Sequence, residues 1–330
     1  MSAEPLRIGI LGAARIAPLA LISPARATGA ARAVAVAARD ADRARSFAEA
    51  HDLPIVADDY EALIRHPEVE AIYVALPPAR HAEMTLAALE AGKPVLCEKP
   101  FAMDAAQARE MTEAAEARGL VLMEAFHYRY HPLFDRVLEI AASGEIGPVR
   151  RIVAAFRTSI AATPRELRYD PALGGGALMD LGTYCIHWCR AVAGGEPRVT
   201  RATAMIGETG VDISTHANLA FEGGVTGHID CDMASPSHAC LEIEGQEGRI
   251  KATNPLAPQL GHLIEVEGLD GARRETCTRD PTYDFQLRAF VAAVQGGRPP
   301  ITSGLDSVRQ MAALDAVRAA VRQVAEGVRA

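Results

Sequence analysis

The sequence has few of the features that mark membrane, nucleic-acid-binding or secreted proteins. Its longest stretch without a charged side chain runs from Ala252 to Ile264, too short for the ~18 apolar residues of a membrane-spanning helix. Acidic residues outnumber basic ones by 42 to 34, and the net charge of −8 disfavours binding to nucleic acids or anionic membranes. No signal peptide is expected, because Glu4 and Arg7 frame a strand pattern at the start of the chain.

The six cysteines are scattered and form no Cys-x-x-Cys pair. This pattern is typical of reduced thiols in the cytoplasm rather than of a disulfide framework. Cys185 and Cys189 lie one helical turn apart, but two thiols without further ligands nearby make a poor zinc site. We therefore expect a cytoplasmic protein with no metal site.

What the sequence does contain is the length for about two domains, since 330 residues exceed the ~150 of a typical domain about twofold. Its 49% of apolar residues is typical of a globular chain. In the first third, short runs rich in Val, Ile and Ala alternate with helical patterns, as in a buried parallel sheet. Strands are expected at residues 7–11, 33–37, 71–76, 94–97 and 120–123, with helices at 40–51, 60–65, 81–91 and 104–118. This alternation predicts a doubly wound α/β (Rossmann) domain over residues 1–125.

After Gly147-Pro148 the strand patterns alternate polar and apolar residues and are separated by glycine turns, typical of an antiparallel sheet. Strands are expected at residues 149–157, 199–205, 213–221, 224–231, 240–244 and 263–266, with helices at 177–192, 283–295 and 305–325. Residues 126–330 thus form an α+β domain with a large, mostly antiparallel open sheet, and the last helix can pack back on the first domain. The helices are too few to cover both faces, so a Val- and Ile-bearing outer face is expected to pack on another subunit.

The first strand leads directly into Gly12-Ala13-Ala14-Arg15-Ile16-Ala17, a variant of the Gly-x-Gly-x-x-Gly/Ala turn of dinucleotide-binding domains. Gly12 permits the tight bend, the small Ala14 lets the backbone approach a pyrophosphate, and Ala17 allows close contact between helix and strand. An ordinary strand–helix turn is the alternative. The position at the first strand–helix junction favours phosphate binding.

The end of the second strand indicates which nicotinamide cofactor fits. NAD-binding domains place Asp or Glu there to accept from the ribose 2′-OH, whereas this chain has Arg39, followed by Asp40. A guanidinium is suited to bidentate binding of a 2′-phosphate, so we expect NADP(H) rather than NAD(H). A solvated Arg39 is the alternative, and Asp40 is expected to cap the next helix in either case.

Polar residues also follow the later strands, at the edge where open α/β sheets bind ligands. The segments concerned contain Leu76, Pro77 and His81 at the end of one strand, Glu98, Lys99 and Pro100 after the next, and Tyr128, Arg129 and His131 after the last. Lys99, between a carboxylate and a proline, is expected to face the crevice where a nicotinamide would lie.

A further polar cluster follows Gly174-Gly175-Gly176. At the ~100° per residue of an α-helix, Asp180, Tyr184 and His187 share one stripe of an otherwise apolar helix. The stripe predicts the wall of a pocket, and a buried hydrogen-bond network is the alternative.

Together these motifs resemble the glucose–fructose oxidoreductase / inositol dehydrogenase (Gfo/Idh/MocA) family. The resemblance rests on Glu98-Lys99-Pro100 and on Gly174-Gly175-Gly176 followed by Asp180-x-Gly182-x-Tyr184, and it extends along nearly the whole chain. Within the family the sequence is most similar to the dihydrodiol dehydrogenase and glucose–fructose oxidoreductase branch, which carries Tyr where inositol dehydrogenases carry His. Pro78 departs from the family pattern, since many members have Asn after the preceding proline.

The resemblance implies hydride transfer between a nicotinamide and the secondary alcohol or ketone of a sugar, cyclitol or sugar derivative. Lys99 would bind the reacting oxygen, Asp180 would hold substrate hydroxyls, and either Lys99 or Tyr184 would carry the proton. A trans-dihydrodiol dehydrogenase and a non-catalytic NADP-binding regulator are the alternatives, and a homodimer or homotetramer formed through the second domain's sheet is implied. Cofactor contacts are expected from Gly12, Ala13, Ala14, Arg15, Ile16, Arg39, Leu76, Pro77, His81, Glu98, Lys99 and Arg129, and substrate contacts from Lys99, Tyr128, His131, Arg168, Asp180, Tyr184 and His187.

Overall fold

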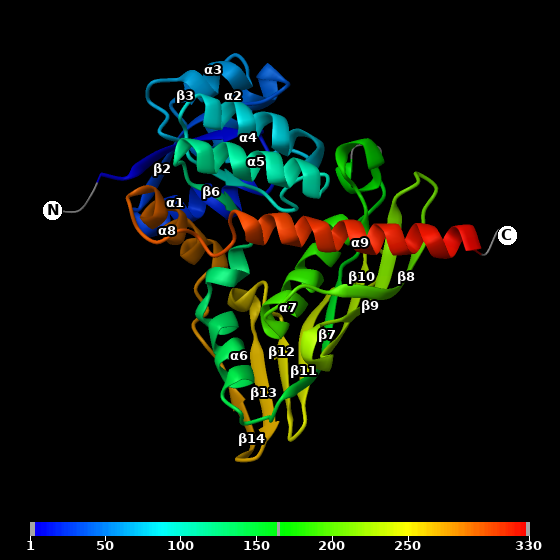
Figure 1. The fold of residues 1–330 in the computed structure, drawn as a ribbon. Helices are drawn as coiled ribbons and strands as arrows, with labels where there is room; N and C mark the ends of the chain where they lie inside the picture. The colour runs from blue at the N-terminus through cyan, green and yellow to red at the C-terminus, as the bar shows by residue number, and fades with distance from the viewer. Residues whose placement is uncertain (1–3, 164–165, 328–330) are drawn as a thin grey trace. The chain divides into compact units, whose positions relative to one another are not determined.

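The computed structural model describes residues 4–163 and 166–327, and the chain divides into two compact units (Figure 1). The first unit contains the residues up to Tyr130 together with Pro281–Val308, and the second contains His131–Asp280 with the residues from Arg309 onward. The sequence analysis placed one boundary after residue 125. The structure groups segment 281–308 with the first unit instead. Among the described residues, no helix has the length and apolar character needed to cross a membrane.

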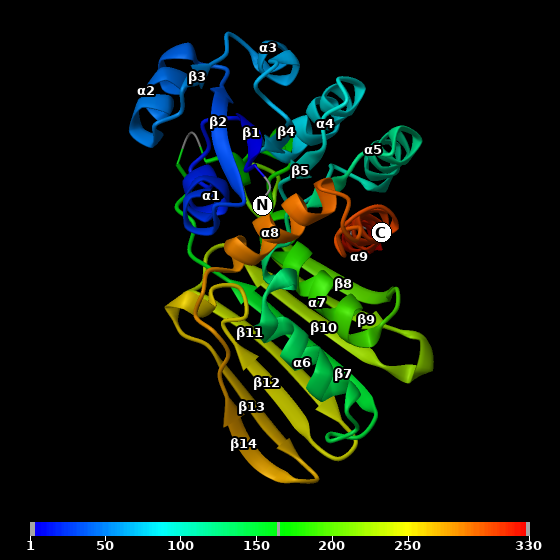
Figure 2. The ribbon, with the colours of Figure 1, turned by 90° about the vertical axis from the view of Figure 1, so that its left-hand side faces the viewer.

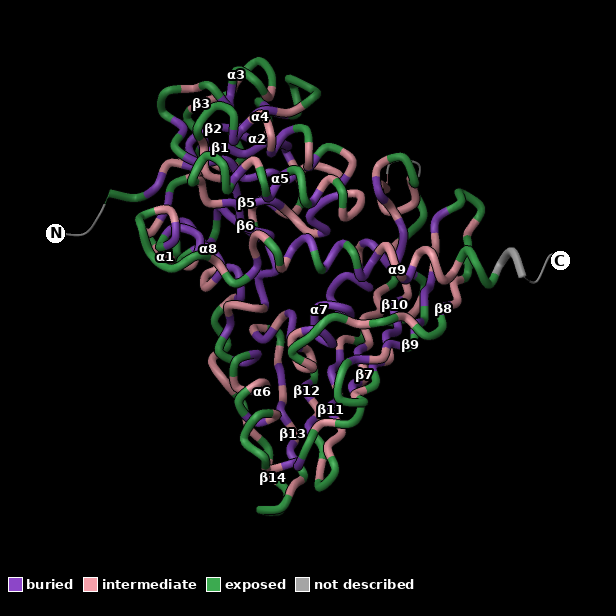
Figure 3. The backbone as a smooth tube through the Cα atoms, viewed as in Figure 1, coloured by how far each residue is buried: buried purple, intermediate pink, exposed green. Residues whose placement is uncertain are grey.

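The first unit is built on a six-stranded parallel sheet with the order β3-β2-β1-β4-β5-β6. The strands are β1 (Leu6–Leu11), β2 (Ala31–Ala37), β3 (Ile55–Val56), β4 (Ala71–Val74), β5 (Val95–Cys97) and β6 (Leu122–Glu124). The central strands are buried (Figure 3), which explains their near-continuous Ala, Val, Ile and Leu content. This is the Rossmann strand order, and it confirms the predicted α/β domain, with the switch point between β1 and β4.

Within residues 4–163 and 166–327, six α-helices accompany this sheet. They are α1 (Ser23–Thr28), α2 (Ala41–His51), α3 (Tyr60–Arg65), α4 (His81–Glu90), α5 (Ala105–Arg118) and α8 (Thr282–Val294). As predicted, Asp40 caps α2 by accepting from the Arg43 N–H at 3.0 Å. Helix α8 packs beside α1 (Figure 2) and buries Tyr283, Leu287 and Phe290 in the core of this unit. Because these side chains of α8 are buried in that core, segment 281–308 belongs to the first unit.

The second unit contains an eight-stranded sheet with the order β14-β13-β12-β11-β7-β10-β9-β8. All its strand pairs are antiparallel except β7 with β10, which confirms the mostly antiparallel sheet. The strands are β7 (Val149–Arg157), β8 (Arg198–Ile206), β9 (Asp212–Ala220), β10 (Thr226–Asp232), β11 (His238–Gly245), β12 (Arg249–Thr253), β13 (Leu263–Gly268) and β14 (Gly271–Glu275). Strands β12 and β14, like β3 of the first sheet, were not among the strands expected from the sequence.

The two faces of this sheet differ in composition. The face covered by α6 (Pro132–Ala142) and α7 (Thr183–Ala193) (Figure 2) carries the buried residues Ile152, Ile229, Ile243, Ile250, Ile264 and Val266. The opposite face carries the ion pairs Arg151–Glu244, Lys251–Glu242, Arg249–Glu267 and Arg274–Glu265. The expectation of a Val- and Ile-bearing outer face was therefore wrong, because the period of two along each strand directs these side chains toward the helices.

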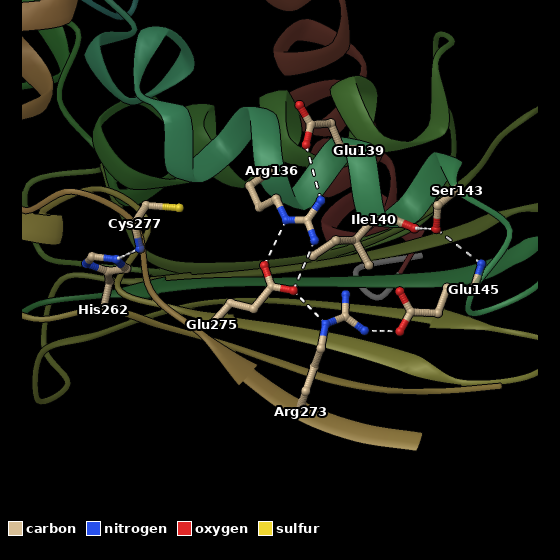
Figure 4. Close-up of polar contacts among 9 residues, drawn as sticks. All are labelled: Arg136, Glu139, Ile140, Ser143, Glu145, His262, Arg273, Glu275 and Cys277. Atoms are coloured by element: carbon tan, nitrogen blue, oxygen red, sulfur yellow. Dashed lines mark hydrogen bonds and ion pairs between the residues drawn. The ribbon is translucent and has the colours of Figure 1, made fainter. Parts of the chain in front are cut away.

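Helix α6 was missed in the sequence, and an ion-pair network holds it on the sheet. Its buried residues Leu133, Phe134, Val137 and Ile140 form one apolar stripe. Figure 4 shows the Glu275 carboxylate at the end of β14 between the guanidinium groups of Arg136 and Arg273. The Arg136 bond is bidentate, with distances of 2.8 and 3.0 Å, a strong geometry for a carboxylate–guanidinium pair. The last helix, α9 (Leu305–Gly327), passes from the first unit into the second after Val308.

Candidate active site

The turn after β1 has the geometry expected of a phosphate-binding turn. The Gly12 N–H donates to the Ala37 carbonyl at the end of β2 at 2.8 Å, and Gly12 has a φ of +103°. A Cβ at this position would lie 2.7 Å from the Ala75 carbonyl oxygen, so the close approach to the chain beyond β4 requires glycine. The turn thus lies at the switch point of the sheet, where open α/β sheets bind ligands.

Two arginines follow β2 near this turn. Arg39 is exposed, and in residues 4–163 and 166–327 no hydrogen bond or ion pair engages its guanidinium. Arg43, one turn into α2, donates from Nη2 to the Ala13 carbonyl at 2.7 Å, so it links α2 to the glycine turn. The sequence analysis missed Arg43. Its place in the first turn of a helix capped by Asp40, shortly after Arg39, was the available signal.

The loop carrying Lys99 is held by a buried phenol. Tyr73 on β4, with no exposed surface, donates from its hydroxyl to Glu98 Oε1 at 2.6 Å, and Glu98 Oε2 accepts from the Lys99 N–H at 3.3 Å. Burial, together with the Glu98 charge, raises the pKa of Tyr73 well above its ordinary value. Tyr73 therefore remains a proton donor and holds Glu98 at the end of β5, while the Lys99 side chain stays half-buried.

His81 joins the two neighbouring strand ends. Its Nε2 lies 2.8 Å from the Leu76 carbonyl and its Nδ1 lies 2.9 Å from the Pro100 carbonyl, and the side chain is fully buried. Burial lowers the pKa of His81, and the nearby Lys99 charge lowers it further, whereas its bonds to backbone raise it. His81 therefore links two loops through hydrogen bonds. One loop contains Leu76 and Pro77, and the other contains Lys99.

The end of β6 is held by the segment that returns from the second unit. The Glu124 N–H donates to the Thr302 carbonyl at 2.8 Å, and the Thr302 hydroxyl donates to the Glu124 carbonyl at 2.6 Å. The Glu124 side chain is buried and accepts from the Phe101 N–H at 3.1 Å. Tyr128, in the following 3-10 turn, is fully buried, whereas Arg129 is half-buried.

In the second unit the expected helix begins irregularly. Residues Leu178–Gly182 form a π-helical turn that continues into α7. The uniform 100° spacing assumed for Asp180, Tyr184 and His187 was therefore wrong, because a π turn contains more residues per turn than an α-helix. Tyr184 and His187 are 5% and 3% exposed, and the Tyr184 ring lies edge-on to Phe156 with centroids 5.6 Å apart.

Asp180 belongs to a chain of three charged side chains. Arg168 donates from Nε to Asp180 Oδ2 at 2.5 Å and from Nη1 to Glu166 Oε1 at 2.9 Å. Burial lowers the pKa of Arg168, but the two carboxylates outweigh this and raise it overall. Arg168 therefore remains a cation that orients Asp180. The sequence analysis missed Glu166.

His131 caps a helix of the second unit. It stands at the N-cap of α6, where its Nδ1 accepts from the Leu133 N–H at 3.0 Å, and it is fully buried. For the described ranges 4–163 and 166–327, no group of three or more His, Cys, Asp or Glu side chains is arranged to hold a metal ion.

The strand order, the glycine turn at its switch point and the lysine that follows β5 are typical of a Rossmann-fold oxidoreductase with a second α+β domain. Residues 6–126 match the model of the oxidoreductase family with an NAD-binding Rossmann fold, and residues 134–251 match the GFO/IDH/MocA C-terminal domain. The chain belongs to the GFO/IDH/MocA oxidoreductase family.

Its relatives include sugar and diol dehydrogenases. D-xylose 1-dehydrogenase (NADP(+)) 2 of Haloferax volcanii is 32% identical over 94% of this chain and 96% of its own. Trans-1,2-dihydrobenzene-1,2-diol dehydrogenase of Sus scrofa is 40% identical over 67% of this chain and 66% of its own. The crystal structure of KijD10, a 3-ketoreductase from Actinomadura kijaniata in complex with NADP and TDP-benzene, has a TM-score of 0.89 at 32% identity, covering 96% and 98% of the two chains.

Proposed function

We propose that this protein is an NADP(H)-dependent oxidoreductase that interconverts a secondary alcohol and a ketone on a sugar, cyclitol or sugar derivative. The observation that carries the proposal is the Lys99 loop at the end of β5. Tyr73 holds it through Glu98, and His81 holds it through the Pro100 carbonyl. A lysine fixed in this way beside the switch point of a Rossmann sheet suits the binding of a reacting oxygen.

The residues of the first unit fit NADP(H). Backbone N–H groups of the turn that follows Gly12 are assigned to the pyrophosphate, and Gly12, whose own N–H binds the Ala37 carbonyl, permits the bend close to the Ala75 carbonyl. Arg39, exposed after β2, and Arg43, on the first turn of α2, offer two cations to the 2′-phosphate. We assign the remaining cofactor contacts to Arg15, Leu76, Pro77, Glu98, Lys99 and Arg129, with His81 acting through the loops that it joins.

When bound, the nicotinamide supplies or accepts the hydride. Lys99 donates a hydrogen bond to the substrate oxygen and so stabilises the negative charge that develops there. Asp180, held by Arg168, accepts hydrogen bonds from neighbouring substrate hydroxyls. Tyr184 or Lys99 carries the proton to or from the reacting oxygen, and His187 and Arg168 are further candidate substrate contacts.

Two substrate classes are in question, and the relatives support both. The xylose dehydrogenase favours carbohydrate-like substrates, and its match covers nearly the whole chain. The 40% identity to the dihydrodiol dehydrogenase favours an aromatic trans-diol as the second candidate. A panel of sugars, cyclitols and trans-diols with NADP+, and of the corresponding ketones with NADPH, ranks the classes by kcat/KM.

The Lys99→Ala variant tests the proposal. We expect it to lose at least about 100-fold in kcat, because an unstabilised oxyanion costs about 2.7 kcal/mol or more, while NADPH binding measured by fluorescence is retained. Lys93→Ala is the matched control, since Lys93 is the only other lysine of this unit and its Nζ bonds the Val69 carbonyl. Unchanged turnover in Lys99→Ala would rule out the assigned role. NADPH binding without turnover on any substrate would favour a regulatory protein.

We also propose a cytoplasmic homodimer or homotetramer. All six cysteines are free, as expected of thiols in a reducing compartment. The charged face of the eight-stranded sheet, rather than an apolar one, is the surface proposed for association. Analytical ultracentrifugation at 0.05 and 1 M NaCl tests this, because association through ion pairs weakens as salt screens them.

A further inference from the structure

We propose that Asp212 is a positioning residue that fixes the start of the helix carrying Asp180 and Tyr184. The proposal rests on the function proposed above for those two residues. Asp212 opens β9 and lies 32 residues after Asp180 in the sequence, outside every motif named in the first subsection.

The carboxylate of Asp212 caps this helix from another element. Its Oδ2 accepts from the Leu178 N–H at 2.7 Å and from the Thr215 hydroxyl at 2.6 Å. Ala177 occupies the N-cap position and has no side chain able to accept a hydrogen bond. The first N–H groups of a helix lack intrahelical partners, and a negative charge at this end is favourable. Asp212 therefore supplies the cap that the local sequence lacks.

The second carboxylate oxygen explains a glycine in the preceding turn. Gly176 has a φ of +119°, and a Cβ there would lie 2.2 Å from Asp212 Oδ1. At Gly175 a Cβ would lie 2.5 Å from the Arg168 carbonyl oxygen. The glycine turn is thus held between Asp212 on one side and the segment containing Arg168 on the other, and Arg168 in turn binds Asp180.

This arrangement makes the position of Asp180 depend on Asp212. The π-helical turn starts at Leu178, whose N–H is the group that Asp212 binds, and Asp180 and Tyr184 follow within two turns. Without the cap, the start of the helix is free to shift, and side chains that must align with a substrate tolerate displacements of only about 0.5 Å. We expect kcat to fall, whereas cofactor affinity should persist because the proposed cofactor groups lie in the first unit.

The test compares Asp212→Ala and Asp212→Asn in the full chain, with Asp270→Ala as a matched control at an exposed aspartate. Asparagine keeps an acceptor oxygen for the Leu178 N–H, and alanine does not. We measure kcat, the KM for NADP+ and hydrogen–deuterium exchange of peptides covering residues 176–184. For Asp212→Ala we expect about a tenfold or greater loss in kcat, a KM for NADP+ within about twofold of wild type, and faster exchange. Asp212→Asn should recover most of the loss.

Wild-type kcat and exchange in Asp212→Ala would overturn the inference, as would equal losses in the alanine and asparagine variants. If Asp212→Ala does not fold, Thr215→Val decides the matter. This variant removes one donor to the same oxygen, and unchanged kcat and exchange in it would also overturn the inference. The exchange measurement needs no substrate. If wild-type protein turns over no substrate, the proposed function fails, while exchange still reports whether Asp212 caps the helix.

Discussion

Arg43 joins two parts of the proposed cofactor-binding edge that lie thirty residues apart in the chain, by donating to the Ala13 carbonyl. Its neighbour Arg39 has no comparable bond among the described residues. The two arginines therefore differ in what they lose on substitution. Substituting Arg39 removes only its contribution to ligand binding. Substituting Arg43 also removes the hydrogen bond that holds the glycine turn.

Arg39→Ala should raise the KM for NADP+ by about tenfold or more and leave the KM for NAD+ nearly unchanged, because a charge-assisted bond to a 2′-phosphate contributes about 1.5–3 kcal/mol. Arg43→Ala should weaken binding of both cofactors, since it also loosens the turn that faces the pyrophosphate. Steady-state kinetics with both cofactors distinguishes the variants. Arg32→Ala, an exposed arginine at the start of β2, is the control. Equal effects of Arg39→Ala on NADP+ and NAD+ would contradict the assignment.

Helix α6 shows how an element is attached by charge as well as by its apolar stripe. Arg136 and Arg273 both bind Glu275, and their hydrogen bonds lower the pKa of this carboxyl to about 2. A carboxyl whose pKa is lower in the folded than in the unfolded state stabilises the fold. The stabilisation is complete when the pH is above the pKa of the unfolded state, and it disappears as the pH falls to the pKa of the folded state.

Glu275→Gln should therefore reduce the free energy of unfolding by about 1–2 kcal/mol at neutral pH, a value that allows for solvent screening of a partly exposed pair. The difference from wild type should hold above about pH 5, narrow as the pH falls from the ordinary glutamate value near 4.5, and vanish near pH 2. Urea denaturation at a series of pH values measures it. Glu267→Gln is the control, since its pair with Arg249 is exposed and should matter little. A difference that does not change with pH would contradict the network's role.

The arrangement of the whole chain was predictable where side-chain periodicity carries the information. Apolar runs predicted most strands of both sheets to within a few residues, although β3, β12 and β14 were missed. Asp40 was recognised as a cap from its own sequence. Helix α6 was missed because His131-Pro132 follows a polar stretch that resembles a loop. The π-helical turn at Leu178 was missed because its hydrogen-bond register leaves no mark in residue spacing.

Contacts between segments that are distant in the chain could not be predicted from the sequence either. Asp212 and Arg43 have ordinary neighbours in the chain, and only the fold brings them to Leu178 and Ala13. Likewise, a helix was expected at residues 283–295, but not that it completes the first unit rather than the second.

Phe290→Ala tests the assignment of α8. Phe290 is fully buried in the core of the first unit, and removing a buried Phe side chain costs about 3–5 kcal/mol. We expect a lower midpoint of thermal unfolding, with a partial recovery in saturating NADPH because a ligand bound by the folded first unit stabilises it. Arg288→Ala, at an exposed position on the same helix, should change neither measurement. A loss that NADPH does not reduce would place α8 outside the cofactor-binding unit.

The return of segment 281–308 to the first unit also determines the order in which the protein can be completed during synthesis. The ribosome delivers residues 4–130 first, but the core that they form lacks Tyr283, Leu287 and Phe290. Those residues emerge only after the whole of 131–280. Residues 4–130 are therefore made before the second unit but finish folding after it has been made, and their unfinished apolar surface is where a chaperone would be expected to bind.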